Sequence, residues 1–131
     1  MSRGIEHQTS VPHTPQQNGQ AERFNCTILE KAEAMHQSAC LPPSFWKEVV
    51  ETALHIYNCQ PMHCLDWLPP ISKWNGKTPD VSYFKVFECL AYVFIPKEDH
   101  QNKLLAKTKE ATFIGYEKGT KEYRFWSPKL R

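Results

Sequence analysis

The chain has 131 residues, of which 40% are hydrophobic and 23% charged, a composition that suits one globular domain or two small ones and argues against a disordered tail. It contains no run of about 18 apolar residues that could span a membrane, and the first ten residues lack the basic-then-apolar pattern of a secretion signal. We therefore expect an intracellular protein whose five cysteines are reduced thiols rather than a disulfide framework.

The net charge of +2 is unevenly distributed along the chain. Residues 81–131 carry ten basic and six acidic side chains, whereas the preceding eighty residues carry more acids than bases. A basic segment of this kind is typical of contact with nucleic acid, but a solvated, lysine-rich β surface explains the charge equally well. Charge alone leaves both interpretations open.

Helical periodicity begins after a turn-rich N-terminal stretch. Residues 1–20 show no helical period, and from Ala21 to Ala39 apolar residues recur at steps of three and four, which predicts one amphipathic helix. A second helix is expected after Ser44, its predicted N-cap, because "FWKEVVETALHIYNC" is apolar over much of a helical circumference. This second helix should be buried between neighbours, and the short link predicts an antiparallel helical hairpin.

The second half of the chain changes character. Residues 61–83 form a proline-punctuated connector with aromatic residues, including Trp67, Trp74 and Tyr83, that we expect to pack against the rest of the protein. Beyond it, "CLAYVFIP", "ATFIGY" and "EYRFW" are rich in β-forming residues, and Gly119 lies in a predicted turn between the last two. Three or more short strands in about 48 residues predict a small β-barrel.

Several segments together resemble a known family. "GIEHQTSVPHTPQQNGQAERFNCTILEKA" is similar to the end of the integrase core of Ty1/copia-type LTR retrotransposon polyproteins. "FWKEVVETALHIYNCQP", "KWNGKTPDVSYFKVFECLAYV" and "FIGYEKGTKEYRFWSP" resemble the segments that follow, including an SH3-like domain. The resemblance implies an α+β chain with a two-helix remnant of an RNase H-like integrase core at 1–60, a connector at 61–83 and a small SH3-like β-barrel at 84–131.

The resemblance also implies site residues. In that family two aspartates and one glutamate bind Mg²⁺ or Mn²⁺ and drive DNA strand transfer, and Glu22 matches the glutamate. Such ions favour several converging carboxylates, because they prefer hard oxygen ligands and activate a nucleophile for attack on phosphate. The expected DNA-contacting residues are Gln16, Gln17, Asn18 and Asn25 by resemblance, and lysines of the basic segment, Lys103, Lys107 and Lys109.

The catalytic set is incomplete in this chain. No aspartate precedes Glu22, whereas Asp66, Asp80 and Asp99 all follow it, in segments similar to the connector and the SH3-like domain. A lone carboxylate cannot hold two ions against the cost of dehydrating Mg²⁺. We therefore expect a truncated integrase fragment that has no catalytic activity and no cofactor of its own, with Met1 either an internal start in a degenerate copy or an artefact of gene prediction. Glu22 would bind metal only if the missing aspartates were supplied; by spacing alone it is an ordinary first-turn helix acid.

Three further expectations concern partners and local geometry. The expected partner is DNA or RNA, bound weakly and without sequence preference, with a nuclear location implied by resemblance and no membrane association. The alternatives are a non-enzymatic module whose exposed helix faces bind a partner or self-associate, and an unexpressed transposon relic. The family usually has glycine where Glu88 stands, so this glutamate is expected in a turn or bulge that disfavours it.

Overall fold

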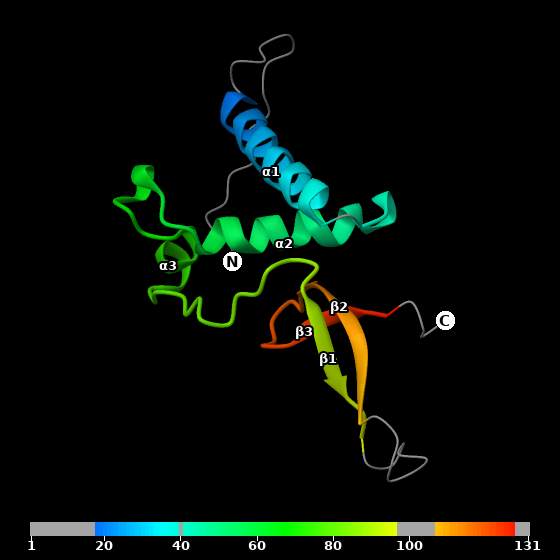
Figure 1. Ribbon diagram of the computed structural model, residues 1–131. Helices are drawn as coiled ribbons and strands as arrows, with labels where there is room; N and C mark the ends of the chain where they lie inside the picture. Colours follow the sequence, from blue (N-terminus) through cyan, green and yellow to red (C-terminus); the bar gives the residue numbers. More distant parts are fainter. Residues whose placement is uncertain (1–17, 40, 97–106, 128–131) are drawn as a thin grey trace, which may run out of the picture.

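The computed structural model describes residues 18–39, 41–96 and 107–127, and shows the α+β composition expected from the sequence (Figure 1). Helices fill the first half and a three-stranded antiparallel sheet the second. The elements are α1 (Gly19–Ser38), η2 (Pro43–Phe45), α2 (Trp46–Cys59), η3 (His63–Leu65), α3 (Pro70–Asn75), β1 (Leu90–Phe94), β2 (Thr108–Tyr116) and β3 (Tyr123–Trp126).

Helix α1 follows the predicted periodicity, but only the second half of its apolar stripe is buried. Ile28 and Ala32 are buried within the helix, and Ala39 is buried just after its end. Nearer the start, Phe24 is partly exposed and meets Tyr57 edge to face, with ring centroids 5.3 Å apart. The N-terminal end of α1 therefore extends away from the core.

The predicted N-cap of the second helix is wrong. Ser44 lies inside η2, and the N-cap position of α2 is Phe45, which makes no side-chain capping bond. Proline favours the first positions of a helical turn because it has no N–H to satisfy there. The Pro42–Pro43 pair therefore starts a 3-10 turn, closed by the bond from Phe45 N to Pro42 O at 3.1 Å, which leads directly into α2.

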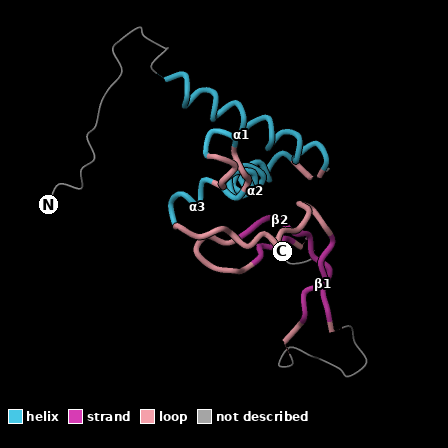
Figure 2. Tube along the Cα trace, turned by 90° about the vertical axis from the view of Figure 1, so that its left-hand side faces the viewer, coloured by secondary structure: helices cyan, strands magenta, loops and turns pink. Residues whose placement is uncertain are grey.

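Helices α1 and α2 cross steeply instead of lying antiparallel, so the predicted hairpin geometry is also wrong (Figures 1 and 2). Their contact is a small core whose buried members are Ala32, Ala39, Val49, Ala53 and, from the segment just before β1, Phe87. Alanine at three of these positions lets the two backbones approach closely. Contact is therefore concentrated where the helices cross.

Strands β1, β2 and β3 are joined in that order by antiparallel pairing. The register shifts between Phe113 and Gly115, which marks an irregularity in the β2–β3 ladder. The predicted turn between β2 and β3 is confirmed: Gly119 has a φ of 79°, and Glu117 N donates to Glu122 O at 3.0 Å. The described strands form an open sheet with β1 and β3 at its edges.

Helix α2 lies between α1 and the sheet, as its broad apolar surface predicted (Figure 2). Val49, Thr52, Ala53 and Cys59 are buried along it. On the sheet side the main buried side chain is Phe113, which is 1% exposed. Helix α2 therefore packs against α1 on one side and against β2 on the other.

The connector packs less completely than expected. Tyr83 is half-buried and its hydroxyl lies 2.8 Å from Nε2 of His55. In contrast, Trp67 lies in a tight turn bounded by a Met62–Leu68 bridge, and Trp74 on the short α3 is 90% exposed. The prediction that both tryptophans anchor the connector is wrong. Local turn geometry, with a φ of 61° at Trp67, decides where that side chain can reach.

Candidate functional site

The first group of predicted site residues lies at the N-terminal end of α1. Glu22 is in the first turn and exposed, and Asn25 is exposed one turn later. Asn18 occupies the N-cap position but makes no side-chain capping bond. Gln16 and Gln17 lie outside the described residues. This end of α1 thus presents a carboxylate and amides to solvent.

The described carboxylates do not fit a divalent-metal site. Within residues 18–39, 41–96 and 107–127, no group of three or more His, Cys, Asp or Glu side chains converges closely enough to hold an ion. Glu22 is therefore not joined there by the additional carboxylates that Mg²⁺ or Mn²⁺ would require.

The second group of predicted site residues lies on the β1–β2 hairpin. Lys107 and Lys109 are exposed, and Lys109 pairs with Val93 across the sheet. Lys103 is outside the described residues. In both views the hairpin and the N-terminal end of α1 lie on opposite sides of α2 (Figures 1 and 2). The structure therefore does not bring Glu22 and these lysines into one site.

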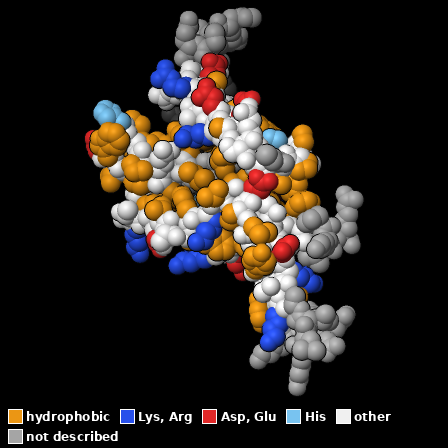
Figure 3. Space-filling model, in the orientation of Figure 1, with side chains coloured by type: hydrophobic (Ala, Val, Ile, Leu, Met, Phe, Trp, Pro, Cys, Tyr) orange, Lys and Arg blue, Asp and Glu red, His pale blue; other side chains and the backbone are white. Residues whose placement is uncertain are grey.

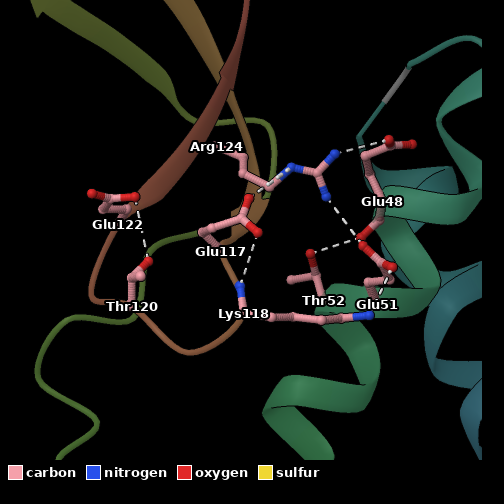
Figure 4. A network of polar contacts seen from close by, with 8 residues as sticks. All are labelled: Glu48, Glu51, Thr52, Glu117, Lys118, Thr120, Glu122 and Arg124. Atoms are coloured by element: carbon pink, nitrogen blue, oxygen red, sulfur yellow. Dashed lines mark hydrogen bonds and ion pairs between the residues drawn. The ribbon is translucent and has the colours of Figure 1, made fainter.

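Two other cations of the basic segment form ion pairs with α2 (Figure 4). Nη1 of Arg124 lies 3.1 Å from Glu51, and its Nη2 lies 3.3 Å from Glu48. Nζ of Lys118 is 3.1 Å from the other oxygen of Glu51. The hydrogen bond that Lys118 donates is the main reason why the pKa of Glu51 is lowered, even though desolvation opposes the shift.

Sequence reasoning missed this network. Glu48 and Glu51 are three residues apart in a predicted helix, which places both carboxylates on one face. That spacing indicates an acidic helix surface but does not name its partner. Their partner Arg124 is 76 positions from Glu48, so the sequence pattern could not identify the pair.

A pocket of about 390 Å³ lies between α2, the connector and the β2–β3 turn. Its aromatic lining includes His55, Tyr83, Tyr116 and Tyr123. Tyr123 donates a hydrogen bond to Tyr83 O at 2.8 Å, and Tyr116 Oη accepts one from Lys85 N at 3.0 Å. Burial lowers the pKa of His55. These bonds join β2 and β3 to the segment between α3 and β1, which forms one wall of the pocket.

Comparisons with known proteins identify relatives of both halves of the chain. Residues 89–131 match the family described as "Retroviral polymerase SH3-like domain". Over 97% of its length the chain is 44% identical to the retrovirus-related Pol polyprotein from transposon TNT 1-94 of Nicotiana tabacum, and over 86% it is 34% identical to that from transposon RE2 of Arabidopsis thaliana.

These two relatives are much longer than the chain. The 131-residue chain spans only 10% of the tobacco polyprotein and 8% of the Arabidopsis polyprotein. An uncharacterized mitochondrial protein of Arabidopsis thaliana is 32% identical over 74% of this chain and 74% of its own length. No solved structure matches. The chain belongs to the family of retrovirus-related Pol polyproteins of copia-type retrotransposons.

Proposed function

We propose that this chain is the end of an integrase core joined to an SH3-like module, and that it binds nucleic acid through lysines of the β1–β2 hairpin. In this proposal α1 and α2 derive from an RNase H-like core, and the β segment is part of an SH3-like barrel. Strand transfer would require carboxylates that do not accompany Glu22 among the described residues. Binding to chromosomal DNA would take place in the nucleus.

The observation that carries the proposal is the different environment of the basic residues. Arg124 and Lys118 form ion pairs with carboxylates of α2. Among the described residues, no ion pair involves Lys107 or Lys109, and both are exposed. Among the described residues, no carboxylate would have to be displaced for a phosphate to reach these two lysines. Figure 3 shows basic side chains on the projecting hairpin, where apolar groups are exposed as well.

If Lys107 and Lys109 contact phosphates, binding to a short labelled DNA duplex should depend on salt. Fluorescence anisotropy at several salt concentrations measures this binding. Each phosphate that a lysine neutralises contributes about 0.9 to the slope of log affinity against log salt. The double variant Lys107→Gln/Lys109→Gln should therefore lower the slope by about 2 and weaken binding to any sequence.

A double variant with the same charge change provides the control. Lys73→Gln/Lys118→Gln also removes two positive charges, but it alters one lysine on α3 and one already paired with Glu51. It should retain most of the affinity and the salt slope. Equal losses in both variants would indicate that net charge alone controls binding and would contradict a hairpin site.

The catalytic part of the proposal needs a separate measurement. Incubation of the 131-residue chain with Mg²⁺ or Mn²⁺ and a labelled duplex should give neither strand cleavage nor strand transfer. A product that disappears in the Glu22→Gln variant would show that this carboxylate is active and would overturn the proposal. DNA binding by the hairpin lysines is measured without metal. It can therefore be tested whatever the outcome of the strand-transfer assay.

A further inference from the structure

The pocket between α2, the connector and the β2–β3 turn combines aromatic walls with a charged rim. Four ring side chains line it and are partly buried: His55, Tyr83, Tyr116 and Tyr123. The charged side chains of its lining are exposed: Asp80, Glu117, Lys121 and Glu122. Its volume of about 390 Å³ is near the lower end of the range for ligand pockets. The space therefore suits a small group rather than an extended ligand.

Hydrogen bonds within the protein already occupy the hydroxyl groups of the three tyrosines. Tyr83 Oη lies 2.8 Å from Nε2 of His55, and Tyr123 donates to Tyr83 O at 2.8 Å. Tyr116 Oη accepts a bond from Lys85 N at 3.0 Å. The rings of Tyr83 and Tyr116 are nearly perpendicular, with an interplanar angle of 88° and centroids 5.6 Å apart, so they form a corner instead of a stack. The walls therefore offer a ligand mainly the electron-rich surface of fixed rings.

The rim carries more negative than positive charge. The described lining residues include three carboxylates, those of Asp80, Glu117 and Glu122, against one lysine, Lys121. Among the described residues, no ion pair involves Asp80 or Glu122, whereas Glu117 lies 4.0 Å from Arg124. Such a rim attracts a cation and repels a phosphate. The pocket is therefore distinct from the hairpin lysines proposed to bind nucleic acid.

The titratable groups of the pocket keep this negative balance at neutral pH. The backbone N–H of Ser82 donates to Asp80 Oδ1 at 2.9 Å, and this bond is the main reason why the pKa of Asp80 is lowered. Burial lowers the pKa of His55, so its ring is uncharged at neutral pH and does not repel a cation. Glu122 Oε2 accepts a hydrogen bond from Thr120 Oγ1 at 3.4 Å, which holds this carboxylate at the β2–β3 turn (Figure 4).

We propose that this pocket binds a methylated ammonium group, of the kind carried by choline or by a trimethylated lysine side chain. Ring faces attract such a cation because of their negative electrostatic potential, as in aromatic cages for quaternary ammonium ligands. A free ammonium would give up hydrogen bonds to water that the occupied tyrosine hydroxyls replace only in part. Methyl groups pack against the rings without that cost, and Asp80 and Glu122 complement the positive charge from the rim.

An NMR chemical-shift titration of the 131-residue chain with choline tests whether the occupant must be a cation. A dissociation constant on the order of 1 mM is expected for so small a ligand. 3,3-Dimethylbutan-1-ol has the shape of choline but a neutral carbon in place of the nitrogen, and it should bind about tenfold more weakly. Equal binding of the two compounds, or no binding of choline up to about 50 mM, would overturn the proposal.

Substitutions in the lining test the position of the site. Tyr123→Leu removes a ring and should weaken choline binding about tenfold, whereas Tyr123→Phe keeps the ring and should stay within about twofold of the wild type. If circular dichroism shows that Tyr123→Leu does not fold, the double variant Asp80→Asn/Glu122→Gln tests the rim instead. It should weaken binding about threefold, and Glu30→Gln/Glu33→Gln, which removes two exposed carboxylates from α1, should not. Unchanged affinity in either folded pocket variant, or an equal loss in the α1 control, would contradict the site.

Peptides distinguish the two sources of a methylated ammonium group. A short peptide with one trimethyllysine should bind about tenfold more tightly than the same peptide with unmodified lysine. Trimethyllysine peptide that binds more tightly than choline assigns the pocket to a protein side chain, and peptide that binds no more tightly assigns it to a small cation. Equal binding of the two peptides would show that rim charge acts alone and would overturn the role of the rings. All titrations omit nucleic acid, so their results are independent of the hairpin lysines.

Discussion

Glu88 has a φ of 69°, a left-handed conformation that costs most residues other than glycine about 1 to 2 kcal/mol. Its N–H donates to Phe113 O at 2.9 Å, and this bond joins the start of β1 to β2. The geometry confirms the expectation that this position prefers glycine. The strain is local, and the surrounding hydrogen bonds hold the residue in that conformation.

Replacing Glu88 with glycine should therefore stabilise the protein. The strain energy removed from the folded state is larger than the free-energy cost of ordering the more flexible glycine. The free energy of unfolding, measured in urea titrations, should therefore rise by about 0.5 to 1 kcal/mol. Glu88→Ala retains the Cβ atom and should give no comparable gain. A similar gain in both variants would show that the glutamate side chain, not its backbone conformation, is unfavourable.

His55 should make stability depend on pH. Burial lowers its pKa from the ordinary value of 6.5, so below about pH 6.5 the unfolded chain binds a proton that the folded protein resists. The free energy of unfolding should fall as the pH drops below about 6.5 and level off once the pH is below the folded pKa. Glu51, whose pKa is also lowered, loses its contribution at a lower pH, beneath its ordinary value of 4.5.

Thermal unfolding at about pH 7.5 and about pH 5.5 checks the effect of His55. In His55→Gln the difference between the two midpoints should shrink, because glutamine does not titrate and still offers a polar group to Tyr83. The control is His63→Gln, at an exposed position, which should keep the wild-type difference. If the difference between the two midpoints is unchanged in His55→Gln, His55 is not the source of the pH dependence.

At the scale of elements, α2 meets β2 at Gly115. A Cβ atom at this position would lie 2.7 Å from Oγ1 of Thr52, and the φ of 135° is one that residues with side chains rarely adopt. Thr52 cannot easily turn away, because its hydroxyl donates to Glu48 O at 2.8 Å. The absence of a side chain at Gly115 is therefore what allows helix and strand to touch.

Gly115→Ala should lower the free energy of unfolding by about 2 to 4 kcal/mol, from the combined clash and backbone strain. Gly119→Ala separates these causes, since Gly119 also has a positive φ but has open space around it. It should cost only about 1 kcal/mol. If the two substitutions destabilise equally, the contact with Thr52 is not the main constraint.

At the scale of the whole molecule, the ion pairs of Arg124 join the helical part to the sheet. They link α2 to β3 across the two segments expected as separate domains. The expected boundaries at residues 60 and 84 stay a prediction, but α2 and β2 contact each other directly. No described helix is long and apolar enough to cross a membrane.

Arg124→Gln should lower the free energy of unfolding by about 1 kcal/mol, measured in urea, since the guanidinium is partly buried and contacts two carboxylates. A double-mutant cycle with Glu51→Gln should give a coupling energy of about 0.5 to 1 kcal/mol. Arg23→Gln, on the exposed N-terminal end of α1, should have little effect. Zero coupling would show that the helix–sheet contact is held by its apolar part alone.

The sequence by itself predicted the two long helices and the β-rich segments, because apolar spacing and β-forming residues act over neighbouring positions, but it missed the short helix α3 in the connector. It also determined the family, since the "TPQQNG" box and the "FIGY" segment are specific. It was wrong about the N-cap at Ser44 and about the tryptophans of the connector. There, a proline pair and a tight turn overrode the wider pattern.

Only the tertiary structure decided the steep crossing of α1 and α2, the ion pairs of Arg124 and the assembly of the pocket around His55. Each depends on residues far apart in the chain, as with Arg124 and Glu48, and the local periodicity carries no information about such pairs. It also decided that Glu22 and the hairpin lysines lie apart. The separation arises because α2 packs between α1 and the sheet, with small residues on both of its contact surfaces.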